Sequence, residues 1–317
     1  MKLKAVEKIT NTFVTTHNFD APDFRPVIIK DINWMSGAKK DRLIHVPNES
    51  MAFLHQKFVK QLRSRTKNTM PSACGGMKKQ SVLTTLDKHR DQSGKFNRYI
   101  YALDLSKAYH QVRIDWLAKI LLKLDGDFFL SEEYLYGFLL RYCTKGETPG
   151  LVMGGGSSPD LFNYYCEYMI DRFLREFTSK NAITYTRYID DLLFSSDKPI
   201  GRKKRQAIRE IILNAKLVIQ ERKSHVYDLQ KNPVSINGVV LHSDGKISVP
   251  RRYMTRIQGI IHRGIHYGDV SFLRIQGMVN VVRMISKGRP QTITEQKLLY
   301  AFEKLKDSTL SLFPQTA

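Results

Sequence analysis

The chain has 317 residues, 42% of them hydrophobic, so it can form one large domain or several lobes around a sizeable core. Its 51 lysines and arginines against 30 aspartates and glutamates give a net charge of +21, which favours a polyanionic partner over a plain solubility surface. The sequence shows no secretory signal, no apolar run that could span a bilayer and no C-x-x-C pair among Cys74, Cys143 and Cys166, and this predicts a cytoplasmic protein without membrane contact, disulfide framework or cysteine zinc site.

The first hundred residues predict short elements of mixed type. Residues 1–39 show weak periodicity and are expected to form an N-terminal extension, with "DAPDFRP" as a loop. "DRLIHVPNES" predicts a strand that ends at Pro47, and "MAFLHQKFVKQLRSRT" predicts an amphipathic helix. After the loop "MPSACGGMKKQ", "SVLTTLDKHRD" predicts a short helix and "NRYIYALDLS" a strand that ends in Asp104.

The middle of the chain carries a helix, a glycine-rich loop and an acidic hairpin. "DWLAKILLKL" predicts a helix with Asp115 as its N-cap. "GETPGLVMGGG" predicts a loop, followed by a helix with Ser158 as N-cap and Pro159 as first helical residue. "YTRYIDDLLFSS" then reads as a hairpin with Asp190 and Asp191 at its tip, and "KKRQAIREIILNAKL" predicts another amphipathic helix.

The C-terminal region is expected to be helical and basic. "SINGVVLHSDGKISVP" predicts two short strands joined by a turn at "SDGK", and residues 251–312 are mainly helical. Basic clusters such as "KKDR", "GRKKRQ" and "PRRYMTR" recur along the whole chain, a spread that suits extended contact with a nucleic-acid backbone. The predicted fold class is α+β, with an antiparallel sheet and helices, followed by a basic helical lobe.

Asp104 and Asp190 indicate a chemistry that needs two metal ions. A lone strand-terminal aspartate is usually a cap or turn residue, and "DD" alone is common on surfaces. An acidic strand end, a loop and capped helix, and an acidic hairpin in this order are far less common. Nucleotidyl transfer builds charge on two oxygens, which two divalent ions about 3.5–4 Å apart can clamp. Mg²⁺ prefers carboxylate, phosphate and water oxygens.

The motifs "YIDD", "LDLSKAY" and "GGGSSPDLF" resemble, in sequence and in order, the palm of reverse transcriptases. Flanking segments from about residue 40 to 310 resemble divergent bacterial retron-type and defence-associated members of that family. The resemblance implies a right-hand polymerase. Its fingers would span residues 40–99, its palm 100–245 with a fingers insertion at about 116–150, and its helical thumb 246–317.

The resemblance also implies residue roles. Asp104 and Asp190 would hold two Mg²⁺ ions, or Mn²⁺, with Asp191 supporting, the Leu105 backbone as a further ligand and Lys223 assisting pyrophosphate departure. Tyr109 would exclude a ribose 2′-OH, and Tyr188 would lie near the primer end. The other substrate-binding positions would be Lys40, Arg42, Leu105, Ser106, Lys107, Ala108, Gly154, Ser158 and Pro159. The primer grip would comprise Ile236, Asn237, Gly238, Val239 and Val240, although these could equally form a plain core strand.

The implied activity is RNA-directed DNA synthesis from dNTPs on a bound structured non-coding RNA, in a retron or an anti-phage defence system. Two alternatives stay open: template-independent or protein-primed DNA synthesis by the same fold, and a non-catalytic RNA-binding scaffold. Met153, where the family usually has glutamine, and the flexible "GGGSS" run keep the first alternative open. Expected partners are the RNA, the DNA product, dNTPs, and either an effector protein or further copies of the chain.

Overall fold

The computed structural model describes residues 3–16, 20–32, 39–66, 70–77, 79–124, 131–146, 150–268 and 271–311. Contacts divide the chain into two compact units. The first comprises Met1–Asp31, Asp41–Arg90 and Asn97–Asp228, and the second comprises Ile32–Lys40, Asp91–Phe96 and Leu229–Ala317. No helix in the described part of the chain has the length and apolar character to cross a membrane. The three cysteines are buried and carry free thiols.

The N-terminal region is more ordered than its weak periodicity predicts. It forms α1 (Leu3–Thr16) and β1 (Phe24–Ile32), and β1 pairs with β2 (Lys39–Pro47). The segment expected to be a loop therefore already contains the start of β1. Tertiary contacts hold α1: Phe13 stacks on Phe53 of α2 (Glu49–Arg65) at 4.5 Å between ring centroids, and Glu7 accepts a hydrogen bond from the Tyr142 hydroxyl. Packing against distant segments thus stabilises elements that local sequence signals indicate poorly.

The helices that follow match the prediction with two differences. α3 (Val82–Asp87) begins with a capping box between Ser81 and Thr84. α4 (Ile114–Leu124) begins two residues earlier than expected for an N-cap at Asp115, so Asp115 lies inside its first turn and pairs with Arg113 instead of capping the helix. α5 (Glu132–Cys143), which the sequence analysis did not identify, packs against α4.

A four-stranded antiparallel sheet forms the centre of the first unit, in the order β4-β5-β3-β6. Its strands are β3 (Tyr99–Asp104), β4 (Thr184–Tyr188), β5 (Asp191–Ser196) and β6 (His225–Asp228). One face packs its aromatic side chains together: Phe194 lies 5.9 Å from Tyr101 and 4.8 Å from Tyr185, between ring centroids. Because side chains alternate along a strand, the residues between these point to the opposite face.

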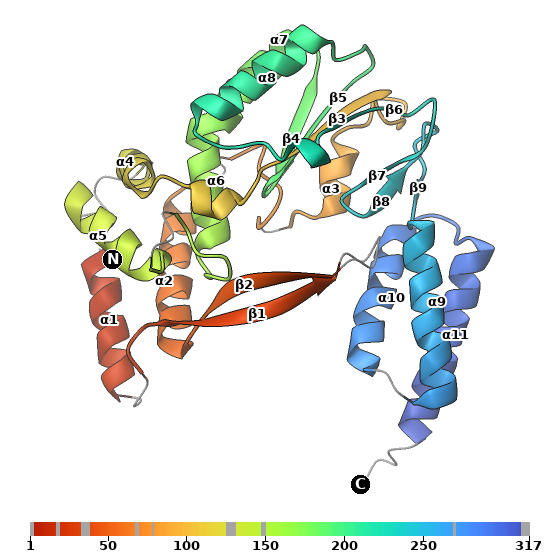
Figure 1. Ribbon diagram of the computed structural model, residues 1–317, viewed down its shortest axis with the longest axis horizontal. Coiled ribbons are helices and arrows are strands. Elements are labelled where there is room, and N and C mark those ends of the chain that lie inside the picture. Colours follow the sequence, from red (N-terminus) through yellow and green to blue (C-terminus); the bar gives the residue numbers. More distant parts are fainter. Residues whose placement is uncertain are drawn as a thin grey trace. The chain divides into compact units, whose positions relative to one another are not determined.

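Helical segments lie on the aromatic face of the sheet. They are α6 (Ser158–Cys166), the π-helical turn η2 (Glu167–Asp171), α7 (Arg172–Lys180) and, after β4 and β5, α8 (Arg202–Asn214). Hydrogen bonds tie them to the sheet, from the Tyr185 hydroxyl to Asp171 and from Arg209 to the Tyr101 hydroxyl. α7 and α8 lie side by side (Figure 1). On the opposite face, the buried His89 bonds to Thr186 and Ser195; burial lowers its pKa to about 3, so the imidazole is neutral.

The start of α6 lies one residue from the predicted position. Ser157 is the N-cap and makes no side-chain capping bond, whereas Ser158 is the first helical residue. The buried Ser158 hydroxyl donates instead to the carbonyl of Val152, which holds the glycine-rich loop against the helix. Pro159 still occupies the first turn, where its missing N–H costs nothing.

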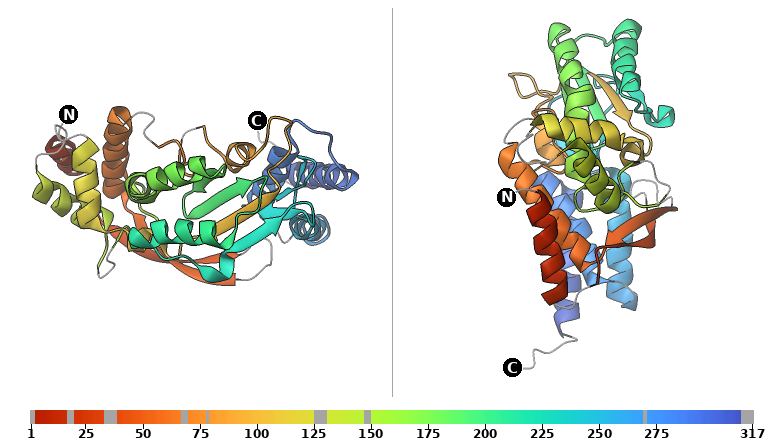
Figure 2. Two further views of the ribbon diagram at one scale, coloured as in Figure 1. Left: turned by 90° about the horizontal axis from the view of Figure 1, so that it is seen from above. Right: turned by 90° about the vertical axis from the view of Figure 1, so that its left-hand side faces the viewer.

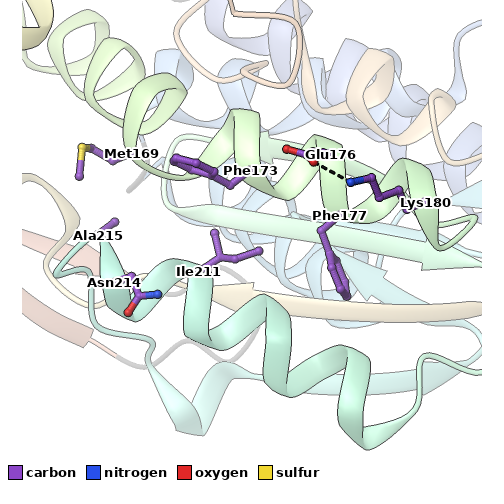
Figure 3. Close-up of a pocket in the computed structure, with 8 residues that line it drawn as sticks. All are labelled: Met169, Phe173, Glu176, Phe177, Lys180, Ile211, Asn214 and Ala215. Atoms are coloured by element: carbon purple, nitrogen blue, oxygen red, sulfur yellow. Dashed lines mark hydrogen bonds and ion pairs between the residues drawn. The ribbon is translucent and has the colours of Figure 1, made fainter.

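An apolar pocket of about 490 Å³ lies between α7 and α8, with Glu176 and Lys180 paired at 2.7 Å beside it (Figure 3). It is lined by Met169, Phe173, Glu176, Phe177, Lys180, Ile211, Asn214 and Ala215. The predicted catalytic acids are absent from this lining.

From Leu229 on, the described residues of the second unit form three short strands and three helices. β7 (Val234–Ile236), β8 (Val239–Leu241) and β9 (Ile247–Ser248) form an antiparallel sheet. The prediction identified only the last two strands. It missed the tight turn between β7 and β8, where Asn237 and Gly238 both have positive φ, as this kind of hairpin requires. α9 (Arg251–Tyr267), α10 (Phe272–Ser286) and α11 (Ile293–Ser311) pack against one another (Figure 2).

Gly154 provides a test of how the glycine-rich loop is held. Its φ is +101°, a Cβ there would lie 2.7 Å from the His45 carbonyl oxygen, and the neighbouring Met153 carbonyl accepts from the His45 N–H at 2.7 Å. Gly154→Ala is expected to lower the free energy of unfolding by about 1–3 kcal/mol, measured by urea denaturation. Gly156→Ala is the matched control, because its Cβ would meet only the His55 side chain at 3.5 Å, and it should cost under about 0.5 kcal/mol. Equal losses in the two variants would contradict this account of the loop.

Candidate active site

Strand register places the predicted acids together at one end of the sheet. Asp104, the last residue of β3, lies directly opposite Asp191, the first residue of β5, and Asp191 lies opposite Tyr188 of β4. The three side chains therefore form a row across three strands, on the face opposite Tyr101 and Phe194. Like charges directly opposite one another destabilise a sheet, so this row requires a compensating positive charge.

Asp190 reaches the same place from the turn between β4 and β5. Its backbone carbonyl accepts a hydrogen bond from the Leu105 N–H at 2.9 Å, which fixes the turn against the end of β3. Ile189, the other turn residue, has a φ of 59°, a conformation that is costly for a β-branched side chain. A strained residue therefore immediately precedes the acid that the sequence analysis favours as metal ligand.

The crowded acids favour protonation. Burial, together with the nearby charges of Asp190 and Asp104, raises the pKa of Asp191 to about 7. Burial also raises the pKa of Asp190, as does Asp104, while the charges of Lys223 and Arg42 act in the opposite direction. Perturbed carboxyl groups of this kind occur often at functional sites.

Two of the predicted basic residues act on the acids. Lys223, at the end of the short 3₁₀ helix η3 (Glu221–Lys223), donates to Asp104 Oδ2 at 2.8 Å. Arg42 of β2 is half-buried, and its charge stabilises ionised Asp190. Lys40 falls in the second unit and remains a prediction from the sequence.

The predicted nucleotide-binding loop runs from the end of β3 into the short 3₁₀ helix η1 (Ala108–Gln111). Leu105 pairs with Ile219, and the Ser106 N–H donates to the Val218 carbonyl, so both residues continue the strand beyond Asp104. Lys107 then has a φ of 45°, and this left-handed residue turns the chain into η1.

Tyr109, the predicted ribose-excluding residue, lies on η1 near the acids. Its ring meets the edge of Phe162 of α6 at 5.4 Å between centroids. Burial, with a contribution from Asp190, raises the pKa of Tyr109 to about 12. Its backbone carbonyl accepts from the Leu151 N–H at 2.9 Å, which ties it to the glycine-rich loop.

The remaining predicted positions divide between the two units. In the first unit, Gly154 lies against the His45 backbone, and a Cβ at Gly76 would come 3.3 Å from Pro159. In the second unit, Ile236 to Val240 form the hairpin of β7 and β8, and their role as primer grip remains a prediction.

The donor set suits hard divalent ions. No three His, Cys, Asp or Glu side chains within the described ranges are grouped as a ready-made metal cluster. Mg²⁺ is commonly held by one or two carboxylates together with substrate phosphates, so a complete protein cage is not needed. The facing Asp104 and Asp191 and the adjacent Asp190 offer carboxylate oxygens whose mutual repulsion a cation would relieve.

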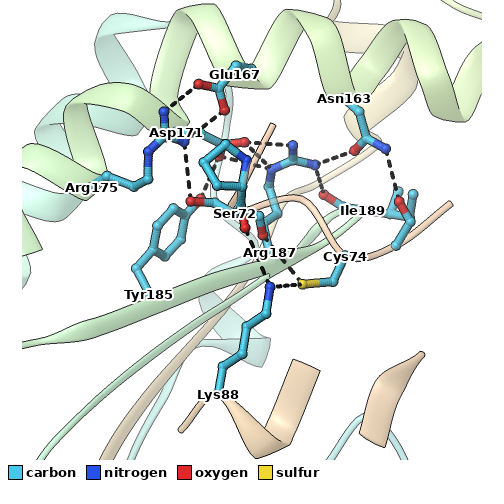
Figure 4. Close-up of polar contacts among 12 residues, drawn as sticks. Ser72, Cys74, Lys88, Asn163, Glu167, Asp171, Arg175, Tyr185, Arg187 and Ile189 are labelled. Carbon is cyan, nitrogen blue, oxygen red and sulfur yellow. Dashed lines mark hydrogen bonds and ion pairs between the residues drawn. The ribbon is translucent and has the colours of Figure 1, made fainter. Parts of the chain in front are cut away.

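Sequence reasoning missed a buried network behind this site, drawn in Figure 4. Arg187 of β4 is fully buried and pairs with the fully buried Asp171 of η2, with Nη2 to Oδ2 at 2.7 Å. Its Nη1 donates to Asn163 Oδ1 and to the Ile189 carbonyl, both at 2.9 Å. The available signal was a charged residue two positions after Tyr185 in an apolar strand, but its partner, 16 positions away, gives no local pattern.

Comparison with known proteins agrees with this geometry. The family model described as "Reverse transcriptase (RNA-dependent DNA polymerase)" matches residues 28–241. Retron Ec83 reverse transcriptase of Escherichia coli is 27% identical over 50% of this chain and 54% of its own length. Retron Ec86 reverse transcriptase of Escherichia coli is 24% identical over 81% of this chain and 76% of its own length. The chain thus spans about half of the first relative and three quarters of the second.

Solved structures show the same fold. Candida albicans telomerase, in complex with a fragment of telomeric RNA, matches 94% of this chain and 62% of its own with a TM-score of 0.51 and 12% identity. Apo telomerase of Candida tropicalis, truncated from its C-terminal domain, matches 76% of this chain and 59% of its own with a TM-score of 0.50 and 11% identity. These likenesses, with the mixed helices and antiparallel sheet, confirm the predicted right-hand polymerase fold class. Because the family model covers most of the chain and the relatives are retron enzymes, the predicted retron-type resemblance is confirmed, and the chain belongs to the reverse transcriptase family.

Proposed function

We propose that the protein is an RNA-directed DNA polymerase that copies a bound non-coding RNA within a retron. The observation that carries the proposal is the meeting of Asp104, Asp190 and Asp191 at the sheet end, with Tyr109 close by. Family membership and the retron relatives support the reaction class. A role in defence against phage remains a prediction from the sequence resemblance.

The reaction joins the primer 3′-oxygen to the α-phosphorus of a dNTP and breaks the bond to the β-phosphate, releasing pyrophosphate. Asp104, Asp190 and Asp191 would hold two divalent ions, Mg²⁺ or Mn²⁺, which when bound neutralise the charge that develops on the attacking and leaving oxygens. Arg42 and Lys223 place positive charge beside the same acids, where an anionic triphosphate would need it. Tyr188, in one row with the acids, is suited to contact the primer end.

The second unit supplies a basic surface for the RNA. A pocket of about 630 Å³ between α9 and α10 is lined by Thr255, Arg256, Gly259, Ile260, Arg263, Ser271 and Arg274. The buried Arg256 Nη1 has no hydrogen-bond partner among the described residues. Arginine groups on a polar surface are typical sites for phosphate oxygens, and the net charge of +21 favours the same partner.

The first prediction tests the metal-binding acids. Asp190→Asn should reduce incorporation of labelled dNTP by purified protein with its co-purified RNA to background, because a neutral amide cannot replace a carboxylate ligand. Asp197→Asn, on the exposed residue just beyond β5, is the matched control and should retain activity. Equal incorporation by wild type and Asp190→Asn would refute the assignment. Product complementary to the bound RNA supports templated synthesis, whereas a homopolymer made after RNA removal supports template-independent synthesis.

The second prediction tests Tyr109. Tyr109→Ala should increase incorporation of ribonucleotides relative to deoxynucleotides, because a ring packed edge-on against Phe162 would otherwise occupy the space of a 2′-OH. The measurement is the ratio of kcat/KM for dGTP and GTP. Tyr109→Phe keeps the ring and should keep the discrimination of the wild type. An unchanged ratio in Tyr109→Ala would exclude Tyr109 as the selective residue.

The third prediction concerns pH. Since the pKa of Asp191 is raised from 3.8 to about 7, the folded protein keeps a proton that the unfolded chain releases within this range. With a chelator present to remove divalent ions, the free energy of unfolding of the wild type minus that of Asp191→Asn should therefore fall as pH rises from 4 to 7. Denaturant titrations at several pH values measure this difference. Added Mg²⁺ should make this fall with pH smaller, because a cation that binds the ionised acids of the folded state stabilises that state. A pH-independent difference would contradict the raised pKa.

A further inference from the structure

Resting on the proposed function, we propose that Arg187 is a positioning residue that fixes both the turn of Asp190 and the ring of Tyr109. Arg187 lies behind the acids, on the aromatic face of the sheet, and its guanidinium joins segments that are far apart in sequence (Figure 4). It would set metal binding and sugar selection without touching substrate.

The burial of Arg187 requires partners for its donors. The side chains of Arg187 and Asp171 are both 0% exposed, so each charge is removed from water. Nε and Nη2 of Arg187 donate to the Asp171 carboxylate, at 3.0 Å to Oδ1 and 2.7 Å to Oδ2. Asp171 also accepts from the Tyr185 hydroxyl at 2.7 Å. Nη1 does not bond to Asp171 and can therefore donate hydrogen bonds to other groups.

One group served by Nη1 is the strained turn. Nη1 donates to the carbonyl of Ile189, the residue with φ of 59° that immediately precedes Asp190. The turn is also confined from outside: a Cβ at Gly75 would lie 2.6 Å from the Ile189 backbone nitrogen. Asn163 accepts from Nη1 and donates to the Gly75 carbonyl at 2.9 Å, so the guanidinium orders both sides of the turn.

The second group is the ring of Phe162. The Arg187 guanidinium carbon lies 5.6 Å from the centroid of this ring, and the same ring meets Tyr109 edge-on at 5.4 Å. Phe162 thus lies between the buried charge and the predicted ribose-excluding residue. A shift of the guanidinium should move Tyr109 and the Asp190 turn together.

Arg187→Lys is the first test. Lysine keeps the charge opposite Asp171, but one ammonium cannot also reach the Asn163 side chain and the Ile189 carbonyl. We expect Mn²⁺ binding, measured by electron paramagnetic resonance without substrate, to weaken about 10- to 100-fold, the usual cost of losing an outer-shell partner. The ratio of kcat/KM for dGTP over GTP should fall in the same variant.

A double variant separates positioning from stability. Asp171→Asn combined with Arg187→Met removes both buried charges and leaves Tyr185 an acceptor, and neutral replacement of a buried ion pair often restores stability. If Arg187 positions the turn, Mn²⁺ affinity stays weak even where the melting temperature recovers. Recovery of Mn²⁺ affinity together with stability would overturn the proposal.

Ile212→Ala is the control for general destabilisation. Ile212 is fully buried on α8 and no hydrogen bond links its side chain to the turn, so this variant should lower the melting temperature while keeping Mn²⁺ affinity and sugar selection. Equal loss of Mn²⁺ affinity in Ile212→Ala and Arg187→Lys would also overturn the proposal. A wild type that makes no DNA but whose Mn²⁺ affinity falls in Arg187→Lys would refute the proposed function alone. An active wild type whose Mn²⁺ affinity and sugar selection are unchanged in Arg187→Lys would refute this inference alone.

Discussion

The buried ion pair between Arg187 and Asp171 constrains the positions of the elements at the centre of the first unit. Removing two charges from water costs several kcal/mol per ion, and mutual attraction compensates only where further hydrogen bonds complete the arrangement. Here Asn163, Tyr185 and the Ile189 carbonyl complete it. A helix, a π-helical turn, one strand and the hairpin turn must therefore take fixed positions around one guanidinium. π-helical turns often mark functional sites, and η2 carries Asp171 here.

The two faces of the β4–β5 hairpin differ in how their charges are balanced. Toward the helices, the charge of Arg187 is neutralised and buried. Toward the other face, Asp104 and Asp191 oppose each other, and Lys223 supplies one positive charge. On one side of the backbone, the buried guanidinium is fully hydrogen-bonded. On the other side, neighbouring carboxylates share a single ion pair with Lys223. This asymmetry explains how a short turn can carry closely spaced acids, because the buried network on the inner face stabilises the turn.

Local sequence patterns predicted the elements whose sequence signal is local, even where their pairing partners are distant. "NRYIYALDLS" and "YTRYIDDLLFSS" indicated three strands and the acids at their ends, and Ser158 and Pro159 indicated the start of the helix that follows the glycine-rich loop to within one residue. α1 and β1 escaped prediction because partners such as Phe53 stabilise them from distant positions. The Asn237–Gly238 turn has a clear local signal, an Asn-Gly pair between apolar residues, yet it was not among the predicted turns. Arg187 could not be interpreted without the fold, because its partners come from α6, η2 and the hairpin turn.

The register also refines how the acids differ from one another. The sequence suggested Asp190 as the partner of Asp104, yet Asp191 lies directly opposite Asp104, while Asp190 is brought near by a turn. A strand residue is fixed by its hydrogen-bonded ladder, so Asp191 is held where burial, with the charges of Asp190 and Asp104, raises its pKa. A turn residue keeps its position only as long as the turn does. The placement of Asp190 therefore depends on Ile189, and through the Ile189 carbonyl on Arg187, so a fully buried charge supports the turn that carries this acid.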